Sequence, residues 1–276
     1  MRFCLNRLKT FSFSVALTVM TPILCVATQG CGNPGNHGHP ASSLQNVFGD
    51  DNRVAMDRHL RPWTAIGKIF DTGCTGTMIG RDLALTAAHC VVDPATSQIS
   101  SNLTWFRADY VSGTASAESW IERIWPGTFQ PERDRGRDWA IIQLRDPIGD
   151  QVGWFDVNFT DANNFPDVLT VAGYSIDSNN GEIAGIDFNC RTRARFATEN
   201  EIFHDCDTAR GSSGGPAFAE FSGAYYVVGV NVAEKRDGGE VSLRLPDYDH
   251  DHANILIPTV GFFDQAKRMQ ALSLSR

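Results

Sequence analysis

The chain has 276 residues, of which 42% are hydrophobic and 20% charged, so it can bury a large core and is not a disordered protein. Its formal net charge is −8, and it becomes −11 without residues 1–27, which hold three basic residues and no acidic ones. Nucleic acids and anionic membrane surfaces require a positive footprint, so this charge excludes both as main partners.

The amino-terminal residues have the pattern of an export signal. Three basic residues precede an apolar stretch that ends in small residues at 27–30. A membrane anchor is the alternative, but the run is short and contains Pro22. We therefore expect residues 1–27 to be a signal peptide. Residues 28–48 are rich in Gly, Pro, Asn and Ser and are expected to be a flexible linker or pro-segment, followed by a folded domain at 49–276.

Five of the seven cysteines lie after this signal, and in an oxidising compartment four of them can pair as two loops of equal span. These pairs are Cys74 with Cys90 and Cys190 with Cys206. The fifth, Cys31, leaves three alternatives open. It resembles the lipidated first residue of a bacterial lipoprotein, although "ATQG" lacks the usual aliphatic residue. Plain secretion and an unpaired or intermolecular thiol are the other two.

Short runs rich in Val, Ile, Leu, Thr and aromatic residues recur along the domain, separated by Gly, Pro, Asp or Asn. The predicted strands are 63–70, 73–79, 83–86, 103–107, 139–144, 168–172, 217–221 and 225–232. Strands at this spacing without alternating helices predict an all-β antiparallel sandwich or barrel. One helix is predicted at the end of the chain, with Val260, Phe263, Ala266 and Leu272 near one face.

Two motifs place a histidine and an aspartate at strand ends. "LALTAAHC" runs from a strand into His89, and "GRDWAIIQL" sets Asp138 directly before another strand. Each residue alone could be structural. A buried carboxylate needs a partner, however, and a histidine ring N–H is a suitable one.

A third motif, "GSSGGP" at 211–216, surrounds a serine with glycines, which allow sharp backbone geometry. The amide hydrogens of Gly211 and Ser213 can then point into one small space that suits an oxyanion. A serine hydroxyl needs a base in order to attack, and that base needs an orienting acid. The three motifs supply all of these groups in the chain order His, Asp, Ser.

Together the motifs resemble the chymotrypsin-fold (trypsin-like) serine proteases over roughly residues 50–272. "DDNRVAMD", "PWTAIGKI" and "CDT" resemble the bacterial glutamyl-endopeptidase-like branch. The resemblance implies two six-stranded antiparallel β-barrels with a C-terminal helix. It also implies that Ser213 is the nucleophile, His89 the general base and acid, and Asp138 its orienting residue, with Gly211 and Ser213 as the oxyanion hole.

Substrate preference depends on residues near the serine. Asp207 lies six positions before Ser213, where trypsin-like members place the acid that binds Arg or Lys. Glutamate-preferring relatives share "CDT" and use a histidine at the position of Asn231 instead. Thr208, Asn231 and Glu234 are the other candidate pocket residues. We favour cleavage after acidic or uncharged residues, with Asp207 turned away from the pocket.

One departure from the common animal motif lies beside the nucleophile. That motif has Asp where this chain has Ser212, and the Asp pairs with a newly cut amino terminus. Ser212 cannot form that ion pair, so an activation switch of this type is not expected.

We therefore expect an exported serine endopeptidase that acts on protein or peptide substrates as a monomer, either secreted or periplasmic, with Cys31 as a candidate membrane attachment. A catalytically silent surface lipoprotein with a protease fold is the alternative. No cofactor or metal is expected, since "DYDHDHAN" at 247–254 lacks a second ligand segment and is typical of an exposed acidic loop.

Overall fold

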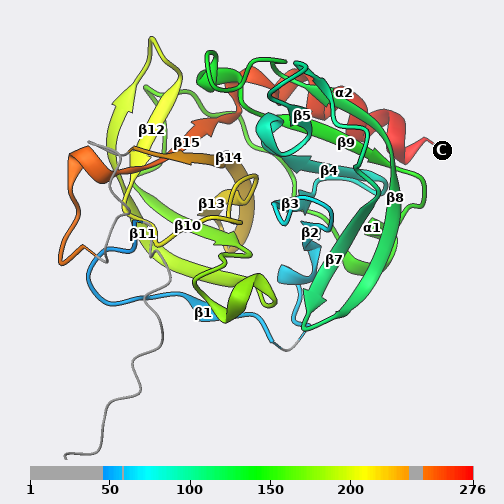
Figure 1. The fold of residues 1–276 in the computed structure, drawn as a ribbon, viewed down its shortest axis with the longest axis horizontal. Coiled ribbons are helices and arrows are strands. Elements are labelled where there is room, and N and C mark those ends of the chain that lie inside the picture. Colours follow the sequence, from blue (N-terminus) through cyan, green and yellow to red (C-terminus); the bar gives the residue numbers. More distant parts are fainter. Residues whose placement is uncertain (1–45, 58, 236–244, 276) are drawn as a thin grey trace, which may run out of the picture. The chain divides into compact units, whose positions relative to one another are not determined.

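Two closed antiparallel β-barrels make up the fold (Figure 1), in a computed structural model that describes residues 46–57, 59–235 and 245–275. The first barrel closes in the order β2-β3-β4-β9-β8-β7. Its strands are β2 (Ile66–Ile69), β3 (Thr75–Met78), β4 (Leu83–Thr86), β7 (Trp105–Val111), β8 (Thr114–Pro126) and β9 (Ala140–Leu144). Short turns join β2 to β3, β3 to β4 and β7 to β8, whereas longer segments lead into β7 and β9. The buried residues of these strands are mainly aliphatic, together with Phe106 and Tyr110.

The second barrel runs in the order β11-β10-β13-β14-β15-β12, and β12 pairs back with β11 to close it. Its strands are β10 (Val168–Gly173), β11 (Gly185–Phe196), β12 (Glu201–His204), β13 (Pro216–Phe221), β14 (Ala224–Glu234) and β15 (Asn254–Pro258). A short strand, β1 (Val54–Ala55), adds to the outside of β11. The predicted fold class of two six-stranded barrels is confirmed.

The remaining elements are short, apart from one helix. A small hairpin pairs β5 (Val92–Asp93) with β6 (Gln98–Ile99), and α1 (Gly149–Val152) is a single turn. The 3-10 turns are Trp63–Ala65, Ala88–Cys90, Arg135–Arg137, Asn179–Gly181, His250–His252 and Thr259–Gly261. The C-terminal helix α2 (Phe263–Leu274) is present as predicted.

The predicted buried face of α2 is correct for Phe263 and Ala266 and wrong for Val260 and Leu272. Val260 is 41% exposed and Leu272 is 60% exposed, whereas Ala266, Gln270 and Ser273 face the protein. Gln270 is held there by its side-chain amide, which donates to the carbonyl oxygen of Ile79 at 2.6 Å. Hydrogen bonds from polar side chains to the barrel therefore determine which face of the helix is buried. The spacing of the hydrophobic residues did not predict this face.

All eight predicted strands are present with shifted ends, but the run at 63–70 begins with the 3-10 turn Trp63–Ala65. Four strands that close the barrels were not predicted, namely β8, β11, β12 and β15. The first two are long and carry charged residues on their outward positions, which weakens the hydrophobic signal.

The segment before β1 is part of the folded unit. Asn46, Val47 and Phe48, which we expected in the linker, are buried. The Arg53 guanidinium donates to both carboxylate oxygens of Asp177, at 2.9 and 2.8 Å. Side-chain exposure is 3% for the arginine and 0% for this aspartate, so this part of the segment lies against the second barrel in a buried ion pair.

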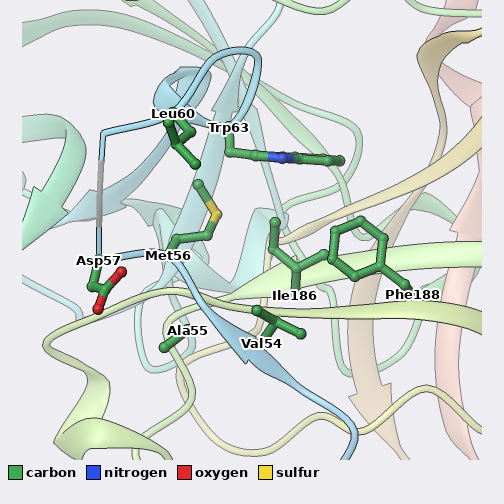
Figure 2. Close-up of a pocket in the computed structure, with 8 residues that line it drawn as sticks. All are labelled: Val54, Ala55, Met56, Asp57, Leu60, Trp63, Ile186 and Phe188. Atoms are coloured by element: carbon green, nitrogen blue, oxygen red, sulfur yellow. The ribbon is translucent and has the colours of Figure 1, made fainter.

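Beyond β1 the same segment borders a mainly apolar cavity of about 400 Å³ (Figure 2). Met56 and Trp63 line it from the segment and Ile186 and Phe188 from β11. None of the residues expected to carry the chemistry lines this cavity. In the part of the chain that the structure describes, no helix is long and apolar enough to span a membrane.

Candidate functional site

The first barrel positions the expected base and its orienting acid. His89 lies in the 3-10 turn that follows β4, and Asp138 lies immediately before Trp139 and β9, which pairs with β4. One Asp138 oxygen accepts the backbone N–H of His89 at 2.8 Å, and the other lies 2.7 Å from its Nδ1. An ionised carboxylate accepts only, so Nδ1 carries the proton and Nε2 presents its lone pair away from Asp138.

The environment of His89 favours its charged form. Burial alone would lower the pKa of His89, but the hydrogen bond with Asp138 and the negative charge of that carboxylate outweigh burial and raise it above the usual value. Asp138 is only 3% exposed, so little water screens its charge. This pair can accept a proton at Nε2 and stabilise the imidazolium that results.

The second barrel supplies the serine loop between β12 and β13. Gly211 has φ +100°, and a Cβ there would meet the carbonyl oxygen of Tyr174 at 2.2 Å. Gly214 has φ +80°, and a Cβ there would meet Thr86 Oγ1 at 2.1 Å. Both positions require glycine. Within the described residues, the backbone N–H groups of Gly211 and Ser213 donate no hydrogen bond, so both can bind an oxyanion.

Thr75 holds this loop, and the sequence did not single it out. Its N–H donates to the Ser213 carbonyl at 2.9 Å, and its hydroxyl donates to the Gly211 carbonyl at 2.7 Å. The hydroxyl oxygen accepts the N–H of Tyr174 at 2.9 Å, and the Thr75 carbonyl accepts the Thr86 hydroxyl at 2.7 Å. Fully buried Thr75 thus holds the Gly211 carbonyl through its side chain and the Ser213 carbonyl through its backbone N–H, on either side of the candidate oxyanion hole.

His89, Gly211 and Ser213 line one cavity of about 480 Å³. In the described part of the chain the Ser213 hydroxyl makes no hydrogen bond, and the His89–Ser213 contact is not closed in this structure. Such contacts often tighten only when substrate is bound. The structure thus brings the expected base, nucleophile and oxyanion amides to one open space.

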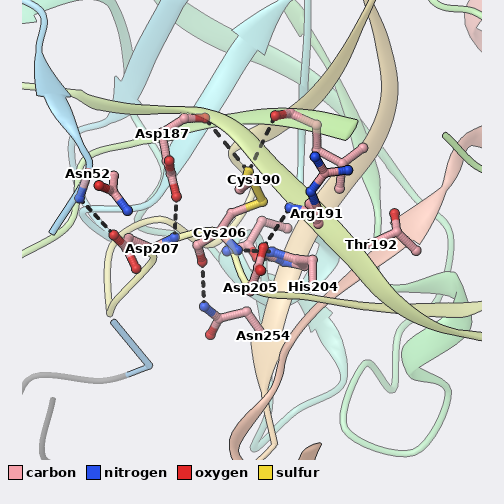
Figure 3. The surroundings of a disulfide bond; sticks show 12 residues. Asn52, Asp187, Cys190, Arg191, Thr192, His204, Asp205, Cys206, Asp207 and Asn254 are labelled. Atoms are coloured by element: carbon pink, nitrogen blue, oxygen red, sulfur yellow. Dashed lines mark hydrogen bonds between the residues drawn. A yellow bond between two sulfur atoms is a disulfide. The ribbon is translucent and has the colours of Figure 1, made fainter. Parts of the chain in front are cut away.

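Asp207 does not point into this cavity. Its two carboxylate oxygens accept the backbone N–H groups of Phe48 and Asn52, each at 2.9 Å, and Figure 3 shows the bond from Asn52. Burial raises the pKa of Asp207, and these two N–H groups oppose the rise. Its own N–H donates to Asp187 Oδ2 at 2.7 Å. The carboxylate is thus occupied by the amino-terminal segment.

The other candidate pocket residues lie elsewhere in the second barrel. Thr208 and Asn231 are buried and Glu234 is partly buried, and none of them lines the cavity with Ser213. Asn231 Oδ1 lies 3.1 Å from Nε2 of His204, a fully buried residue that the sequence analysis missed. Burial lowers the pKa of His204 to about 4, so the ring is neutral. Its Nδ1 accepts the Cys206 N–H at 3.2 Å, which places the ring proton on Nε2, facing Asn231.

Ser212 stands at the position of the Asp that forms an ion pair in the common animal motif, and its side chain has another serine as its partner. The hydroxyls of Ser212 and Ser175 are hydrogen-bonded and buried. The N–H of the next residue, Ile176, donates to the Arg210 carbonyl at 2.8 Å. Asp177, the partner of Arg53, follows directly. The loop beside the serine is therefore tied to the amino-terminal segment through side chains of one chain.

Both predicted disulfides are present. Cys74 is joined to Cys90 beside His89, and Cys190 to Cys206 one residue before Asp207 (Figure 3). Donor atoms of Cys74, His89 and Cys90 lie within 4.8 Å of one another, but the two sulfurs are bonded and offer no thiolate to a metal. In the expected acidic loop, Asp249 accepts the N–H of Asp251 and is exposed, as predicted.

Similarity to curated proteins extends over about two thirds of the chain. The chain is similar to a glutamyl endopeptidase from Bacillus licheniformis, with 27% identity over 188 residues. That match covers 65% of this chain and 57% of the relative, so it spans little more than half of the curated protein.

Solved structures share the fold at low identity. A Glu endopeptidase in complex with MPD matches with a TM-score of 0.66 and 21% identity, over 82% of this chain and 99% of that one. A thermostable serine protease AL20 from an extremophilic microorganism gives 0.57 and 19%, over 78% and 99%. The protease Anisep from Arthrobacter nicotinovorans gives 0.55 and 20%, over 78% and 100%.

The Trypsin family matches residues 51–245, which is most of the chain and includes His89, Asp138 and Ser213. The fold, the order of the three motifs and this match agree, and the chain belongs to the trypsin family.

Proposed function

We propose that the protein is an exported serine endopeptidase that hydrolyses peptide bonds through an acyl-enzyme. The observation that carries the proposal is the shared cavity. His89, which is hydrogen-bonded to buried Asp138, lines it together with Ser213 and Gly211, whose backbone N–H groups donate no hydrogen bond among the described residues. His89 Nε2 takes the Ser213 proton as the hydroxyl attacks the carbonyl carbon. The N–H groups of Gly211 and Ser213 stabilise the oxyanion, and His89 then protonates the departing amine.

Labelling by an organophosphorus serine reagent tests this mechanism. Wild-type protein should be labelled at Ser213 and should cleave peptides, and Ser213→Ala should lose all labelling and at least about 10³-fold in kcat. Ser101→Ala, at an exposed turn, is the matched control and should behave as wild type. A folded wild-type protein that is neither labelled nor active would instead support a silent binding protein.

We also propose that the residue before the scissile bond is acidic or uncharged. Asp207 is the one candidate that would favour Arg or Lys, and both of its carboxylate oxygens accept hydrogen bonds from backbone N–H groups. The relatives named as Glu endopeptidases agree with this preference, although Asn231 replaces the histidine expected for strong glutamate selection. Thr208 and Asn231 remain the proposed polar pocket residues, with Glu234 at its edge.

A peptide-library cleavage profile measures this preference. Asp207→Ser should leave the ranking of residues before the bond unchanged. The variant should be less stable by about 1–3 kcal/mol per buried N–H left without a partner. Dominant cleavage after Arg or Lys that disappears in Asp207→Ser would overturn the proposal.

Export and attachment stay predictions, because residues 1–27 and Cys31 lie outside the described residues. We propose secretion or periplasmic release, with Cys31 as the candidate anchor. The mass and amino-terminal residue of the mature protein decide between a lipidated Cys31 and a free chain. The proposed monomer is tested by light scattering.

A further inference from the structure

The cavity that holds Ser213 extends to one side of the nucleophile. The Cys74–Cys90 disulfide forms one wall, and residues of the loop after β10, among them Tyr174 and Ile176, form another. Any peptide whose carbonyl is attacked by Ser213 must place part of its chain in this space. The chemistry of the walls therefore bears on which peptides are accepted.

This cavity does not fit the side chain that precedes the scissile bond. None of the four candidate residues for that pocket, Asp207, Thr208, Asn231 and Glu234, lines it. His89 does line it, and in the proposed reaction His89 must hand its proton to the departing amine. The chain that continues from that amine leaves past His89, so the cavity takes the residues that follow the bond.

The walls of this cavity carry positive charge in an acidic protein. Among the described residues that line it, the charged side chains besides His89 are Lys68 and Arg210, and no Asp or Glu is present. The formal net charge of the whole chain is −8, so a basic lining is contrary to the general character of the molecule. A cleft lined by one sign of charge attracts ligands of the other.

The two cations differ in what they already bind. Lys68 Nζ donates to the Gly181 carbonyl at 2.8 Å, lies 3.5 Å from Glu182 Oε1 and stands 5.1 Å from the centre of the Tyr110 ring. Its side chain is 13% exposed, so it mainly supports the cavity wall. This cation is largely compensated inside the protein.

Arg210 is exposed, and its guanidinium forms no hydrogen bond or ion pair with any described residue. It directly precedes Gly211, one of the proposed oxyanion donors, and its carbonyl is fixed by the Ile176 N–H. The backbone that carries Arg210 is therefore held beside the reaction centre. A guanidinium with open donors pairs best with a carboxylate, which it can bind through two parallel hydrogen bonds.

We propose that Arg210 binds a carboxylate side chain of the substrate on the leaving-group side of the scissile bond, so that peptides with Asp or Glu shortly after the bond are preferred. This inference rests on the proposed endopeptidase function. It adds a second recognition site, separate from the pocket for the preceding residue. Lys68 lines the same cavity, but because it is already paired inside the protein the recognition is assigned to Arg210.

Synthetic peptides with one fixed sequence before the bond test the proposal. Glu, Gln or Lys is placed in turn at each of the three positions after it, and kcat/KM is measured. Wild type should prefer Glu over Gln by about three- to fivefold at one position at least, and Lys should be the poorest. Because exposed charges are screened, the preference should shrink as salt is raised from 0.05 to about 0.5 M.

Variants assign the preference to one residue. Arg210→Gln should reduce the Glu-to-Gln ratio to about one, Arg210→Glu should invert it in favour of Lys, and Arg210→Lys should keep part of it. Arg268→Gln, which removes an exposed arginine from α2, is the matched control and should retain the wild-type ratio. Each comparison is a ratio within one variant, so a general loss of activity does not affect it.

Two results would overturn the proposal. One is a wild-type Glu-to-Gln ratio below about two at all three positions, and the other is a preference that persists in both Arg210→Gln and Arg210→Glu. Serine labelling separates failure of this proposal from failure of the function. A chain labelled at Ser213 without acidic preference loses only the Arg210 site, and an unlabelled, inactive chain loses both.

Discussion

Thr75 lets the first barrel fix a loop of the second. Its hydroxyl accepts from the Tyr174 N–H and donates to the Gly211 carbonyl, so the peptide group that follows Gly211 cannot turn without breaking a buried hydrogen bond. Oxyanion stabilisation depends on donors that are already oriented before reaction. A threonine on β3 that contacts no substrate atom can therefore influence the rate.

Thr75→Val keeps the shape of the side chain and removes the hydroxyl. We expect kcat to fall about tenfold with KM nearly unchanged, because the loop is freed rather than the substrate site. The free energy of unfolding should fall by about 1–3 kcal/mol, because two buried backbone groups lose their partner. Steady-state kinetics and thermal unfolding measure both quantities.

Thr75→Ser is the matched control, since it restores the hydroxyl and should recover most of kcat. A Thr75→Val protein that unfolds earlier but turns over at the wild-type rate would show that Thr75 has a structural role alone.

The pH profile should report the charge of Asp138 on His89. The base must be neutral to accept a proton, and the hydrogen bond and charge of Asp138 raise the pKa of His89 despite burial. The acid limb of kcat/KM should therefore lie above the usual histidine value of about 6.5. In Asp138→Asn only burial remains, so the limb should move to lower pH while the maximal rate falls by about 10³–10⁴.

A wild-type acid limb at or below about pH 6.5 would contradict this assignment. Asp134→Asn is the control, because Asp134 is a partly exposed carboxylate just before the 3-10 turn Arg135–Arg137, which Asp138 follows. This variant should leave the acid limb of kcat/KM in place.

Hydrophobic patterning identified the strands whose inward residues form the core and missed those that carry charges. β8 and β11 are each at least 12 residues long, and many of their outward positions hold Arg or Glu. β12 and β15 are short and follow polar loops. They are recognised as strands by their pairing with neighbouring strands, and the periodicity of the sequence carries no information about that pairing.

Helix α2 illustrates the same limit. Its apolar residues suggested a face at positions 260, 263, 266 and 272, yet the buried positions 266, 270 and 273 include a glutamine and a serine. The Ser273 hydroxyl is hydrogen-bonded to Asp82, and Gln270 reaches the carbonyl of Ile79. A polar contact with a barrel strand end decides the orientation, and that contact is formed only in the folded protein.

Gln270→Ala should therefore destabilise the protein by about 1–3 kcal/mol, because the buried Ile79 carbonyl loses its donor. Leu272→Ala, two residues away on the exposed face, should change stability by less than about 0.5 kcal/mol. Urea unfolding of both variants gives the comparison. A larger loss for Leu272→Ala than for Gln270→Ala would mean that the helix packs through its apolar face in solution.

At the scale of the whole molecule, the sequence was sufficient to propose the reacting groups but not the residues that support them. His89, Asp138 and Ser213 stand in motifs of fixed spacing, so residue type and order were sufficient to propose them. Thr75, His204 and Arg53 act through contacts with residues more than 20 positions away. Nothing in the local sequence of these three residues distinguishes them from ordinary strand or loop positions.

The pH dependence of folding should be set in part by Asp187. Burial raises its pKa from 3.8 to about 7, the Asp207 N–H opposes the rise, and the charges of Asp207 and Asp205 add to it. The folded protein then holds a proton that the unfolded chain releases, so this group lowers stability as pH rises from about 4 to about 7. Asp187→Asn keeps an acceptor for the Asp207 N–H and removes the titration.

The melting temperature of Asp187→Asn relative to wild type should increase through this pH window and stay constant above about pH 7. A difference that does not vary between pH 4 and 7 would show that Asp187 titrates normally. Asp161→Asn, which changes a partly exposed carboxylate in a loop, serves as the control.

The buried Arg53–Asp177 pair bears on when the loop beside Ser213 becomes ordered. The positive charge that holds the loop beside the serine comes from the Arg53 side chain and not from a chain terminus. In the folded chain the loop is therefore held by a side chain, without the ion pair from a newly cut amino terminus that the animal motif uses. For the exported endopeptidase proposed above, this would place the onset of activity at folding, so that the timing of folding relative to export would control it.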